Sequence, residues 1–395
     1  MSRFLFVVPP LAGHTYPTVA VGNELAGRGH QVAWAGHAEI VGPLLPAGAY
    51  LIPVGTPAAV AEMEAIQARS RGLRGAAALR FLWEDFLIPL AASMVPGVEA
   101  AIDEFAPDAL VVDQQAVAGA LVARRRGLRW ATSATTSAEL TDPFALMPRL
   151  ADWVTRCLRD FQRSFGVPEA EARTGDLRFS DHLVLAFSTA ALVGPVERFP
   201  GHYVFVGPSI GVRSDRSSSA AFPWDWLDPA RQHVLVSLGT VNRDAGRRFF
   251  TAAAEAVAPL GERIQTVLVA PTDLLDAPSD HVLVREFVPQ LELLPHLDAV
   301  VSHAGHNTVC ESLAHGVPLV VAPIRDDQPI VAQQVVDAGA GIRVRFGRGG
   351  ATELRDAVTA VLDDPAYRTA AQRIRASFDA AGGAAAAADH LEKLA

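Results

Sequence analysis

The stretch VVSHAGHNTVCESLAHGVPLVVAP, residues 300–323, places a polar turn and a helix between two apolar runs. The runs 300–302 and 318–323 have the continuous apolar character of strands that are buried on both faces. Between them we expect a helix that begins at Asn307 and ends near His315, where GVP stops it. A strand, a helix and a second strand in this order predict a parallel βαβ unit.

The polar turn of this unit, residues 303–308, has the properties of an anion site. It lies at the carboxyl end of a strand and at the start of a helix, where ligands bind in open parallel sheets. Free N–H groups and the helix dipole favour negative charge there. His303, Asn307 and Thr308 add hydrogen-bond donors, Gly305 allows close approach, and Glu311 lies one turn further on, where it suits a ribose diol. The turn therefore favours a nucleoside diphosphate, although Asn307 and Thr308 would also serve as plain helix caps.

A metal site is the alternative reading of the same segment. The potential ligands are His303, His306, Cys310, Glu311 and His315. At helical spacing no four of these side chains converge, so we do not expect a metal here. Asp326–Asp327 resembles a magnesium pair, but no second carboxylate pair supports it.

Outward from this unit, apolar runs alternate with helical segments along most of the 395 residues, a length that favours more than one domain. The Ser-rich stretch 211–223 interrupts the pattern and reads as a linker. We therefore predict an α/β protein of two Rossmann-like domains. Their expected bounds are 1–207 and 227–376, with a linker over 208–226 and a C-terminal helix over 377–395 that could return to the first domain.

Composition limits the class of protein. The net charge of −9 without a basic block argues against nucleic acid as a partner. Two cysteines give no disulfide framework, so we expect a cytoplasmic protein. The expected oligomeric state is a monomer or a homodimer. The apolar start FLFVVPPLAG is broken by two prolines and is too short for a signal peptide. We also expect no membrane span, which would need about 20 apolar residues.

The first domain offers a candidate general base. His14 follows the first expected strand, in the loop before a helix expected from Thr18 to Arg28, and Asp113 ends the apolar run ALVVD. Both residues therefore lie at the carboxyl edge of one sheet. A histidine that accepts a proton becomes cationic, and a carboxylate on its other nitrogen orients it and stabilises that charge. Taken singly, His14 could be a structural loop residue and Asp113 a helix cap.

A family resemblance connects the two domains. The segment FVPQLELLPHLDAVVSHAGHNTVCESLAHGVPLVVAPIRDDQPIVAQQVVDAGAG, residues 287–341, resembles the nucleotide-sugar box of family 1 GT-B glycosyltransferases. PPLAGHTYPTVAVGNELAGRGHQVAW near the N-terminus is similar to the start of the same proteins, and DQQAVAG matches the family around Asp113. The resemblance covers essentially the whole chain and implies the GT-B fold, in which two Rossmann-like domains face each other across a cleft.

The resemblance also implies roles for individual residues. His14 and Asp113 match the family's catalytic pair. The residues implied to bind the donor are Ser237, Gly239, Thr240, Phe287, Val288, Gln290, His303, Gly305, Asn307, Thr308, Glu311, Asp327 and Gln328. Phe287 stands where the family commonly has tryptophan, and Ala304 where it often has glycine or cysteine. These departures leave the choice between UDP and dTDP open, with Glu311 favouring UDP.

The expected reaction is an inverting, metal-independent transfer of a hexose from a UDP- or dTDP-sugar to a hydroxyl of a small, largely apolar acceptor. No cofactor besides the nucleotide sugar is expected. Trp83, Phe86, Phe144 and Met147 could line the acceptor pocket, although aromatic residues at helical spacing more often belong to the core. Two other functions stay open: a nucleotide-sugar epimerase or hydrolase on the same fold, and a non-catalytic partner that binds nucleotide sugar.

Overall fold

The computed structural model describes the chain except for residues 56–64, 67, 71, 74, 142–147, 212–221, 240–245 and 274–278. The chain divides into two compact units. Unit 1 consists of Met1–Thr189, Pro195–Ser214 and Ala381–Ala395. Unit 2 consists of Ala190–Gly194 and Asp215–Ala380. Most of the expected linker lies outside the described residues.

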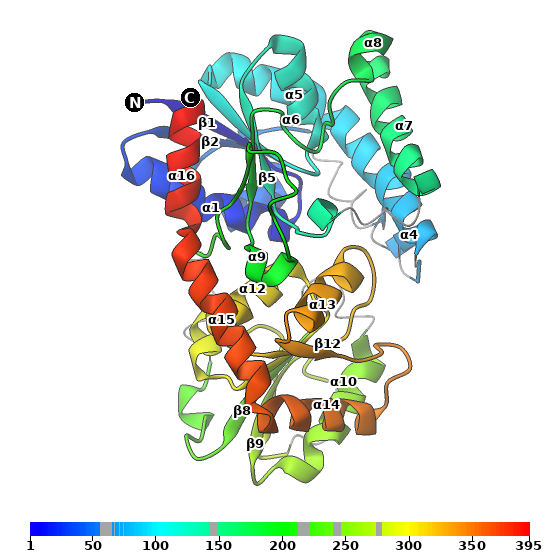
Figure 1. Cartoon of the computed structure of the whole chain (residues 1–395), viewed down its shortest axis with the longest axis vertical. Coiled ribbons are helices and arrows are strands. Elements are labelled where there is room, and N and C mark those ends of the chain that lie inside the picture. The colour runs from blue at the N-terminus through cyan, green and yellow to red at the C-terminus, as the bar shows by residue number, and fades with distance from the viewer. Residues whose placement is uncertain are drawn as a thin grey trace. The chain divides into compact units, whose positions relative to one another are not determined.

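Unit 1 is built on a parallel sheet of seven strands in the order β3-β2-β1-β4-β5-β6-β7 (Figure 1). The strands are β1 (Arg3–Val7), β2 (Gln31–Gly36), β3 (Tyr50–Pro53), β4 (Ala109–Asp113), β5 (Trp130–Ala134), β6 (Leu183–Ala186) and β7 (Tyr203–Phe205). The strand order reverses between β1 and β4, so the carboxyl ends of these two strands border the crevice where open α/β sheets bind ligands.

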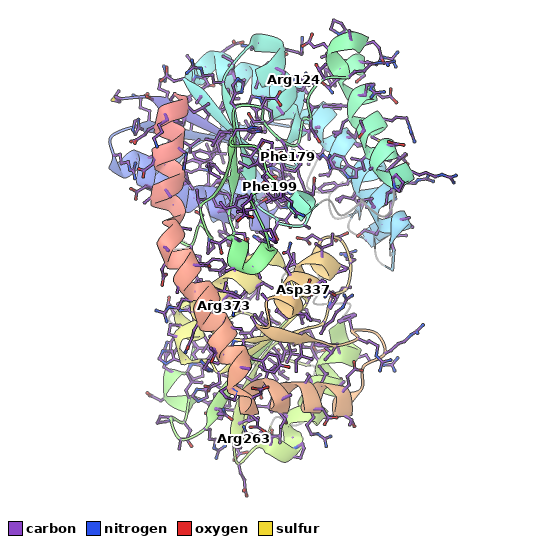
Figure 2. All side chains as sticks on the ribbon, in the orientation of Figure 1. Arg124, Phe179, Phe199, Arg263, Asp337 and Arg373 are labelled. Carbon is purple, nitrogen blue, oxygen red and sulfur yellow. The ribbon has the colours of Figure 1, made fainter. Side chains whose placement is uncertain are left out.

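Helices cover both faces of this sheet because its strands are apolar on both sides (Figure 1). Leu5 and Val7 pack with α5 (Ile88–Phe105) and α6 (Val117–Arg126). Phe4 and Phe6 pack on the other face with α1 (Ala12–Gly27) and α16 (Gly383–Leu394). A smaller apolar cluster lies beside β6 and β7, where Phe199 contacts Phe205 with ring centroids 5.2 Å apart (Figure 2).

The remaining helices of unit 1 include the segment from Ala76 to Phe105, which is helical throughout its 30 residues. It consists of α4 (Ala76–Arg80), the π-helix η2 (Phe81–Leu87) and α5. Its mean hydropathy reaches 1.4 over 18 residues, and half of that stretch is buried. In the described part of the chain this is the one helix long and apolar enough to cross a membrane, and Trp83, Leu87 and Met94 anchor it in the core instead. The other helices are α2 (Ala38–Val41), η1 (Gly42–Leu44), η3 (Glu139–Thr141), α7 (Pro148–Ser164) and α8 (Glu169–Ala172).

The first helix corrects the expected position of His14. α1 begins at Ala12, six residues before the expected start at Thr18, and includes Pro17. Pro17 is the sixth residue of this helix and lies beyond its first turn, so it removes one N–H that would otherwise donate to the carbonyl four residues earlier. His14 therefore lies on the first helical turn and not in a loop, which fixes its backbone.

The C-terminal helix α16 packs against the beginning of the chain (Figure 1). Gly382 separates it from α15 (Pro365–Ala381) with a left-handed φ of 86°, which only glycine adopts without strain. Arg28 donates to Asp389 over 2.6 Å and to Glu392 over 3.1 Å, and His30 Nε2 lies 2.9 Å from Glu392. This helix therefore belongs to the core of unit 1.

Unit 2 contains a second parallel sheet, of six strands in the order β10-β9-β8-β11-β12-β13. The strands are β8 (Gln232–Ser237), β9 (Ile264–Val269), β10 (Val282–Arg285), β11 (Ala299–Ser302), β12 (Leu319–Val321) and β13 (Gly341–Arg343). Its helices include α9 (Ala190–Val193), α10 (Arg247–Val257), α11 (Gln290–Leu293), α12 (His306–Ala314), α13 (Gln328–Asp337), α14 (Ala351–Asp363) and α15. Here the strand order reverses between β8 and β11, and the last residues of these strands, Ser237 and Ser302, are paired. The prediction of two parallel α/β sheets is confirmed.

Candidate active site

The strand ends of unit 1 bring together a histidine, a carboxylate and a hydroxyl at the β1–β4 reversal. His14 is on the first turn of α1, Asp113 ends β4, and Thr135 directly follows β5. The Nδ1 atom of His14 lies 3.0 Å from both carboxylate oxygens of Asp113 and 2.8 Å from Oγ1 of Thr135. Asp113 is fully buried, and the side chain of His14 is 17% exposed. The predicted pair is therefore in contact, and its histidine is reachable.

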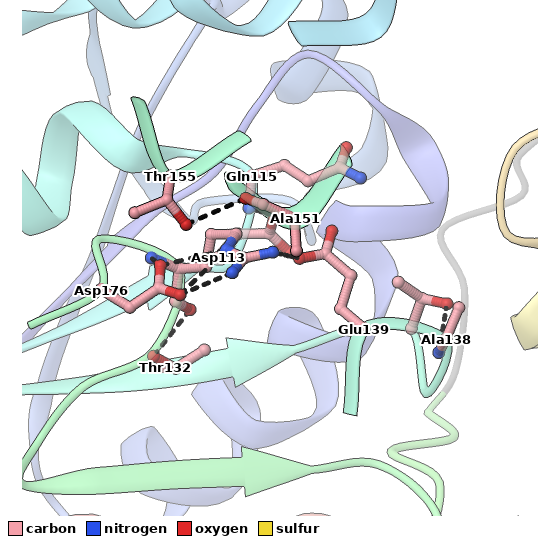
Figure 3. A network of polar contacts seen from close by, with 10 residues as sticks. Asp113, Gln115, Thr132, Ala138, Glu139, Ala151, Thr155 and Asp176 are labelled. Atoms are coloured by element: carbon pink, nitrogen blue, oxygen red, sulfur yellow. Dashed lines mark hydrogen bonds and ion pairs between the residues drawn. The ribbon is translucent and has the colours of Figure 1, made fainter. Parts of the chain in front are cut away.

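The carboxylate of Asp113 is held by donors on both oxygens. The backbone N–H of Gln115 donates to Oδ1 over 2.8 Å (Figure 3). The hydroxyl of Thr135 donates to Oδ2 over 2.8 Å. Hydrogen bonds to a buried carboxylate favour its charged form. A charged Asp113 accepts the Nδ1–H of His14, so Nε2 is the basic nitrogen of the neutral ring.

A half-buried ion cluster joins the turn that follows Thr135 to the loop before β6 (Figure 3). Arg178 donates to Glu139 over 3.2 Å and grips Asp176 through Nε and Nη2. Burial raises the pKa of Glu139 against the opposing charge of Arg178, and the negative charge of Asp113 acts in the same direction as burial. Sequence reasoning missed Thr135, Glu139, Asp176 and Arg178. For Thr135 a signal exists, because it ends a strand adjacent to β4 at the same sheet edge.

In unit 2, His303 lies between two glycines at the β8–β11 reversal. A Cβ atom added at Gly239 would lie 2.8 Å from Cε1 of His303, and one added at Gly305 would lie 2.6 Å from Nε2. Gly239 also has a left-handed φ of 69°. These two positions thus require glycine. Burial lowers the pKa of His303 to about 4, although the charge of Asp327 acts in the opposite direction, so the imidazole is neutral at pH 7.

The start of α12 supplies the expected helix N-terminus. The helix begins at His306, one residue before the expected Asn307, and Gly305 is its N-cap. Asn307 and Thr308 are half-buried in its first turn, and no acidic residue occupies that turn. Ala304 adopts a left-handed φ of 66° at the position where glycine is common in the family that the sequence resembles. This strained conformation turns the chain from β11 into the helix.

Glu311, expected at the ribose, and Gln290, expected at the donor site, are in contact. Nε2 of Gln290 donates to Oε2 of Glu311 over 2.6 Å, and Glu311 is 4% exposed. Nearby in sequence, Phe287 is 60% exposed, which makes it one of four exposed large hydrophobic residues in the described chain, and Val288 is half-buried. An exposed aromatic ring presents a face on which a base can stack.

The remaining predicted donor residues have mixed surroundings. Ser237 is buried, and its hydroxyl accepts the N–H of Gly239 over 3.3 Å. Oε1 of Gln328 accepts the backbone N–H groups of Ile324 and Arg325, so this oxygen orders the loop before α13. Asp327 is the N-cap residue of α13 and is half-buried. Thr240 lies outside the described residues.

Of the residues expected at the acceptor pocket, Trp83 and Phe86 are buried in the core of unit 1, and Phe144 and Met147 lie outside the described residues. A cavity of about 970 Å³ lies between α4, η2 and α7. Its described lining includes Leu73, Phe81, Leu150, Trp153, Arg149 and Arg156. Neither Trp83 nor Phe86 is part of that lining.

The described residues contain no group of three or more His, Cys, Asp or Glu side chains arranged to hold a metal ion. His306 and Cys310 form a buried contact of 3.5 Å between Nε2 and Sγ. Burial raises the pKa of Cys310 above its ordinary value, so its thiol is protonated.

Comparisons with known proteins agree in one direction. Residues 256–394 match the family model of the erythromycin biosynthesis protein CIII-like C-terminal domain. The chain is 31% identical over 422 residues to 4'-demethylrebeccamycin synthase of Lentzea aerocolonigenes, covering all of this chain and 99% of that protein. It is 30% identical over 419 residues to demethyllactenocin mycarosyltransferase of Streptomyces fradiae, covering all of this chain and 87% of that protein.

Solved structures of similar proteins have the same architecture. The structure of the glycotransferase of kitacinnamycin matches with a TM-score of 0.76 and 27% identity, over all of this chain and 99% of that one. The glycosyltransferase VinC in complex with dTDP matches with a TM-score of 0.75 and 22% identity, over 99% of both chains.

Proposed function

The chain belongs to the GT-B glycosyltransferases of antibiotic and natural-product biosynthesis, and from this premise we propose a specific reaction. The enzyme transfers a hexose from a UDP- or dTDP-sugar to a hydroxyl of a small, largely apolar acceptor, with inversion and without a metal ion. The contact between His14 and Asp113 at the β1–β4 reversal carries this proposal.

In the proposed reaction, Nε2 of His14 removes the proton of the acceptor hydroxyl. The acceptor oxygen then forms a bond to the anomeric carbon from the face opposite the diphosphate, and the bond between that carbon and the phosphate oxygen breaks. The buried charge of Asp113 stabilises the imidazolium while it lasts. The proton subsequently passes from His14 to solvent, and the nucleoside diphosphate leaves.

The donor is proposed to bind to unit 2. Backbone N–H groups at the start of α12 and the side chains of Asn307 and Thr308 receive the diphosphate, with His303 as a neutral donor. Glu311, oriented by Gln290, accepts the ribose hydroxyls, and Phe287 offers its exposed face to the base. A helix terminus and fixed donors stabilise the charge that develops on the leaving diphosphate, which is the task a metal would otherwise perform.

The acceptor is proposed to bind to unit 1. The cavity of about 970 Å³ has apolar walls that include Phe81, Leu150 and Trp153. Its volume lies within the range of about 300–1,000 Å³ that small-molecule sites span. These walls support an acceptor that is largely apolar.

A single set of incubations tests the proposal. The enzyme is incubated with UDP-glucose or dTDP-glucose and a panel of apolar phenols and alcohols, and products are identified by mass spectrometry and by the anomeric coupling constant in NMR. We expect acceptor-dependent β-glucoside formation that survives excess EDTA and is reduced about 10²–10⁴-fold in His14→Gln. Sugar release or epimerisation without acceptor would indicate the hydrolase or epimerase, and nucleotide binding without any product would indicate a binding protein. Activity that EDTA abolishes and Mg²⁺ restores would contradict metal independence.

A further inference from the structure

Thr135 makes a contact in unit 1 that the reaction above does not explain. Its Oγ1 is 2.8 Å from Oδ2 of Asp113 and 2.8 Å from Nδ1 of His14. The residue is 3% exposed, so its hydroxyl exchanges little with solvent. Thr135, which follows β5, therefore contacts both His14 on α1 and Asp113 at the end of β4.

The geometry gives the hydroxyl a defined task. Asp113 is fully buried, and its carboxylate accepts one backbone N–H, from Gln115, in addition to its contacts with His14 and Thr135. Besides the histidine, the hydroxyl of Thr135 donates to Oδ2 of Asp113. Without this hydroxyl a buried oxygen loses a partner, and the carboxylate is free to rotate away from the imidazole.

The turn that carries Thr135 is anchored at both of its ends. At one end, β5 lies between β4 and β6 in the middle of the sheet. At the other end, Glu139 accepts a hydrogen bond from Arg178, which also donates two hydrogen bonds to Asp176. The hydroxyl of Thr135 is thus presented by backbone that has little freedom to move.

We propose that Thr135 is a positioning residue of the acceptor base, whose hydroxyl fixes the Asp113 carboxylate in the orientation that holds His14 for proton removal. This inference rests on the proposed function of His14 and Asp113. Thr135 donates to Asp113 and does not itself take the acceptor proton.

The same arrangement predicts the direction of a change in pH dependence. Asp113 faces His14 and Thr135 directly, and the negative Glu139, paired with Arg178, lies on the neighbouring turn. A valine at position 135 cannot donate, so the carboxylate can turn away from the imidazole and stabilises the protonated His14 less. Because protonated His14 is inactive as a base, the acid limb of kcat/KM moves to lower pH.

The test compares Thr135→Val and Thr135→Ser with wild type and with His14→Gln. We expect Thr135→Val to lower kcat about 10- to 100-fold, the loss typical when a buried acceptor is left without its donor. KM for the nucleotide sugar should stay unchanged, and the acid limb should move to lower pH. Thr135→Ser restores the hydroxyl and should recover most of the turnover.

Ser133→Ala is the matched control. Ser133 lies two residues earlier at the end of the same strand, and its buried hydroxyl has no hydrogen-bond partner among the described residues. We expect wild-type turnover from it, and melting temperatures of all variants report whether each one folds. If Thr135→Val does not fold, Thr135→Ala replaces it in the comparison.

Two results would overturn the positioning role. Wild-type kcat and an unshifted acid limb in Thr135→Val would show that the hydroxyl is not needed, and equal losses in Thr135→Ser and Thr135→Val would show that it is not the relevant group. If His14→Gln is inactive in the same series, the proposed function stands and Thr135 alone is wrong. If His14→Gln keeps full turnover, the proposed function itself fails.

Discussion

Replacing Asp113 with asparagine should reverse the tautomer of His14, and the surrounding donors determine how. One carboxylate oxygen becomes an NH₂ group. At the Oδ1 position that group would face the N–H of Gln115, donor against donor, so the amide oxygen occupies this position. The NH₂ group therefore takes the Oδ2 position, where the hydroxyl of Thr135 can turn to accept from it. There it donates to Nδ1 of His14, which leaves the ring proton on Nε2.

The size of the effect follows from two losses. The basic nitrogen is protonated in the resting ring, and the imidazolium loses the buried negative charge that lies 3.0 Å away. Where a buried carboxylate orients a catalytic histidine, the asparagine variant loses about 10⁴-fold in rate. Because His14 is 17% exposed, solvent screens part of the charge effect, and we expect a loss of about 10²–10⁴ in kcat. This corresponds to about 3–5.5 kcal/mol.

The assay measures kcat with an aliphatic alcohol and with an acidic phenol as acceptors. The alcohol needs the base more, so its rate should fall further than that of the phenol. Long-range ¹⁵N–¹H spectra of the ring report the tautomer directly, and calorimetry should show unchanged affinity for UDP or dTDP. An Asp113→Asn enzyme within about tenfold of wild type on the alcohol, or one whose ring keeps its proton on Nδ1, would refute this reasoning.

Three further predictions concern unit 2. His303 should titrate near pH 4 in NMR spectra of the free protein, with His303→Gln as the assignment control. Because this pKa is below the unfolded value, the stability that the residue contributes is complete above about pH 6.5 and declines as the pH falls toward 4. A titration near pH 6.5 would contradict the burial of the ring. Glu311→Ala should weaken UDP binding by about 1.5–3 kcal/mol and dTDP binding by less in calorimetry, since deoxyribose offers one hydroxyl fewer, and equal losses would speak against contact with the diol. Gly341→Ala should lower the free energy of unfolding by about 1–3 kcal/mol in urea titrations, because its Cβ would collide with the carbonyl oxygen of Leu319. Gly27→Ala is the control, since a Cβ at that position would meet no neighbouring atom. Equal stabilities of the two variants would show that the backbone at Gly341 shifts at no cost.

Strand positions were the most predictable part of the fold, because buried parallel strands are apolar runs that stand out from helices. Such runs predict β1, β4, β11 and β12, and the ends of β1 and β4 lead to His14 and Asp113. The short strands β3, β6 and β10 were not recognised. Each has four residues, and β3 ends in a proline while β10 ends in an arginine, features that local patterns associate with turns and surfaces.

Contacts between distant residues could not be predicted from local patterns. Glu139 and Arg178 are 39 residues apart, and only the pairing of β5 with β6 brings their turns together. Gln290 and Glu311 were identified through family resemblance, and their hydrogen bond emerged from the packing of unit 2. The expected start of α1 at Thr18 is six residues too late, because a proline in a helical pattern usually marks a boundary and Pro17 lies inside this helix.

Unit 1 combines segments that precede and follow unit 2 in the sequence, so it can be completed only after unit 2 has been synthesised. Phe4 and Phe6 share an apolar cluster with Ala387, Ala388 and Leu391, which are translated after all of Asp215–Ala380. All of Asp215–Ala380 is made in between, which at bacterial elongation rates takes on the order of 10–30 s. During that interval the nascent first unit exposes an apolar surface where α16 will bind. The second unit can therefore fold before the first unit is completed by α16. A chaperone that shields this surface would bind the part of the protein that was translated first.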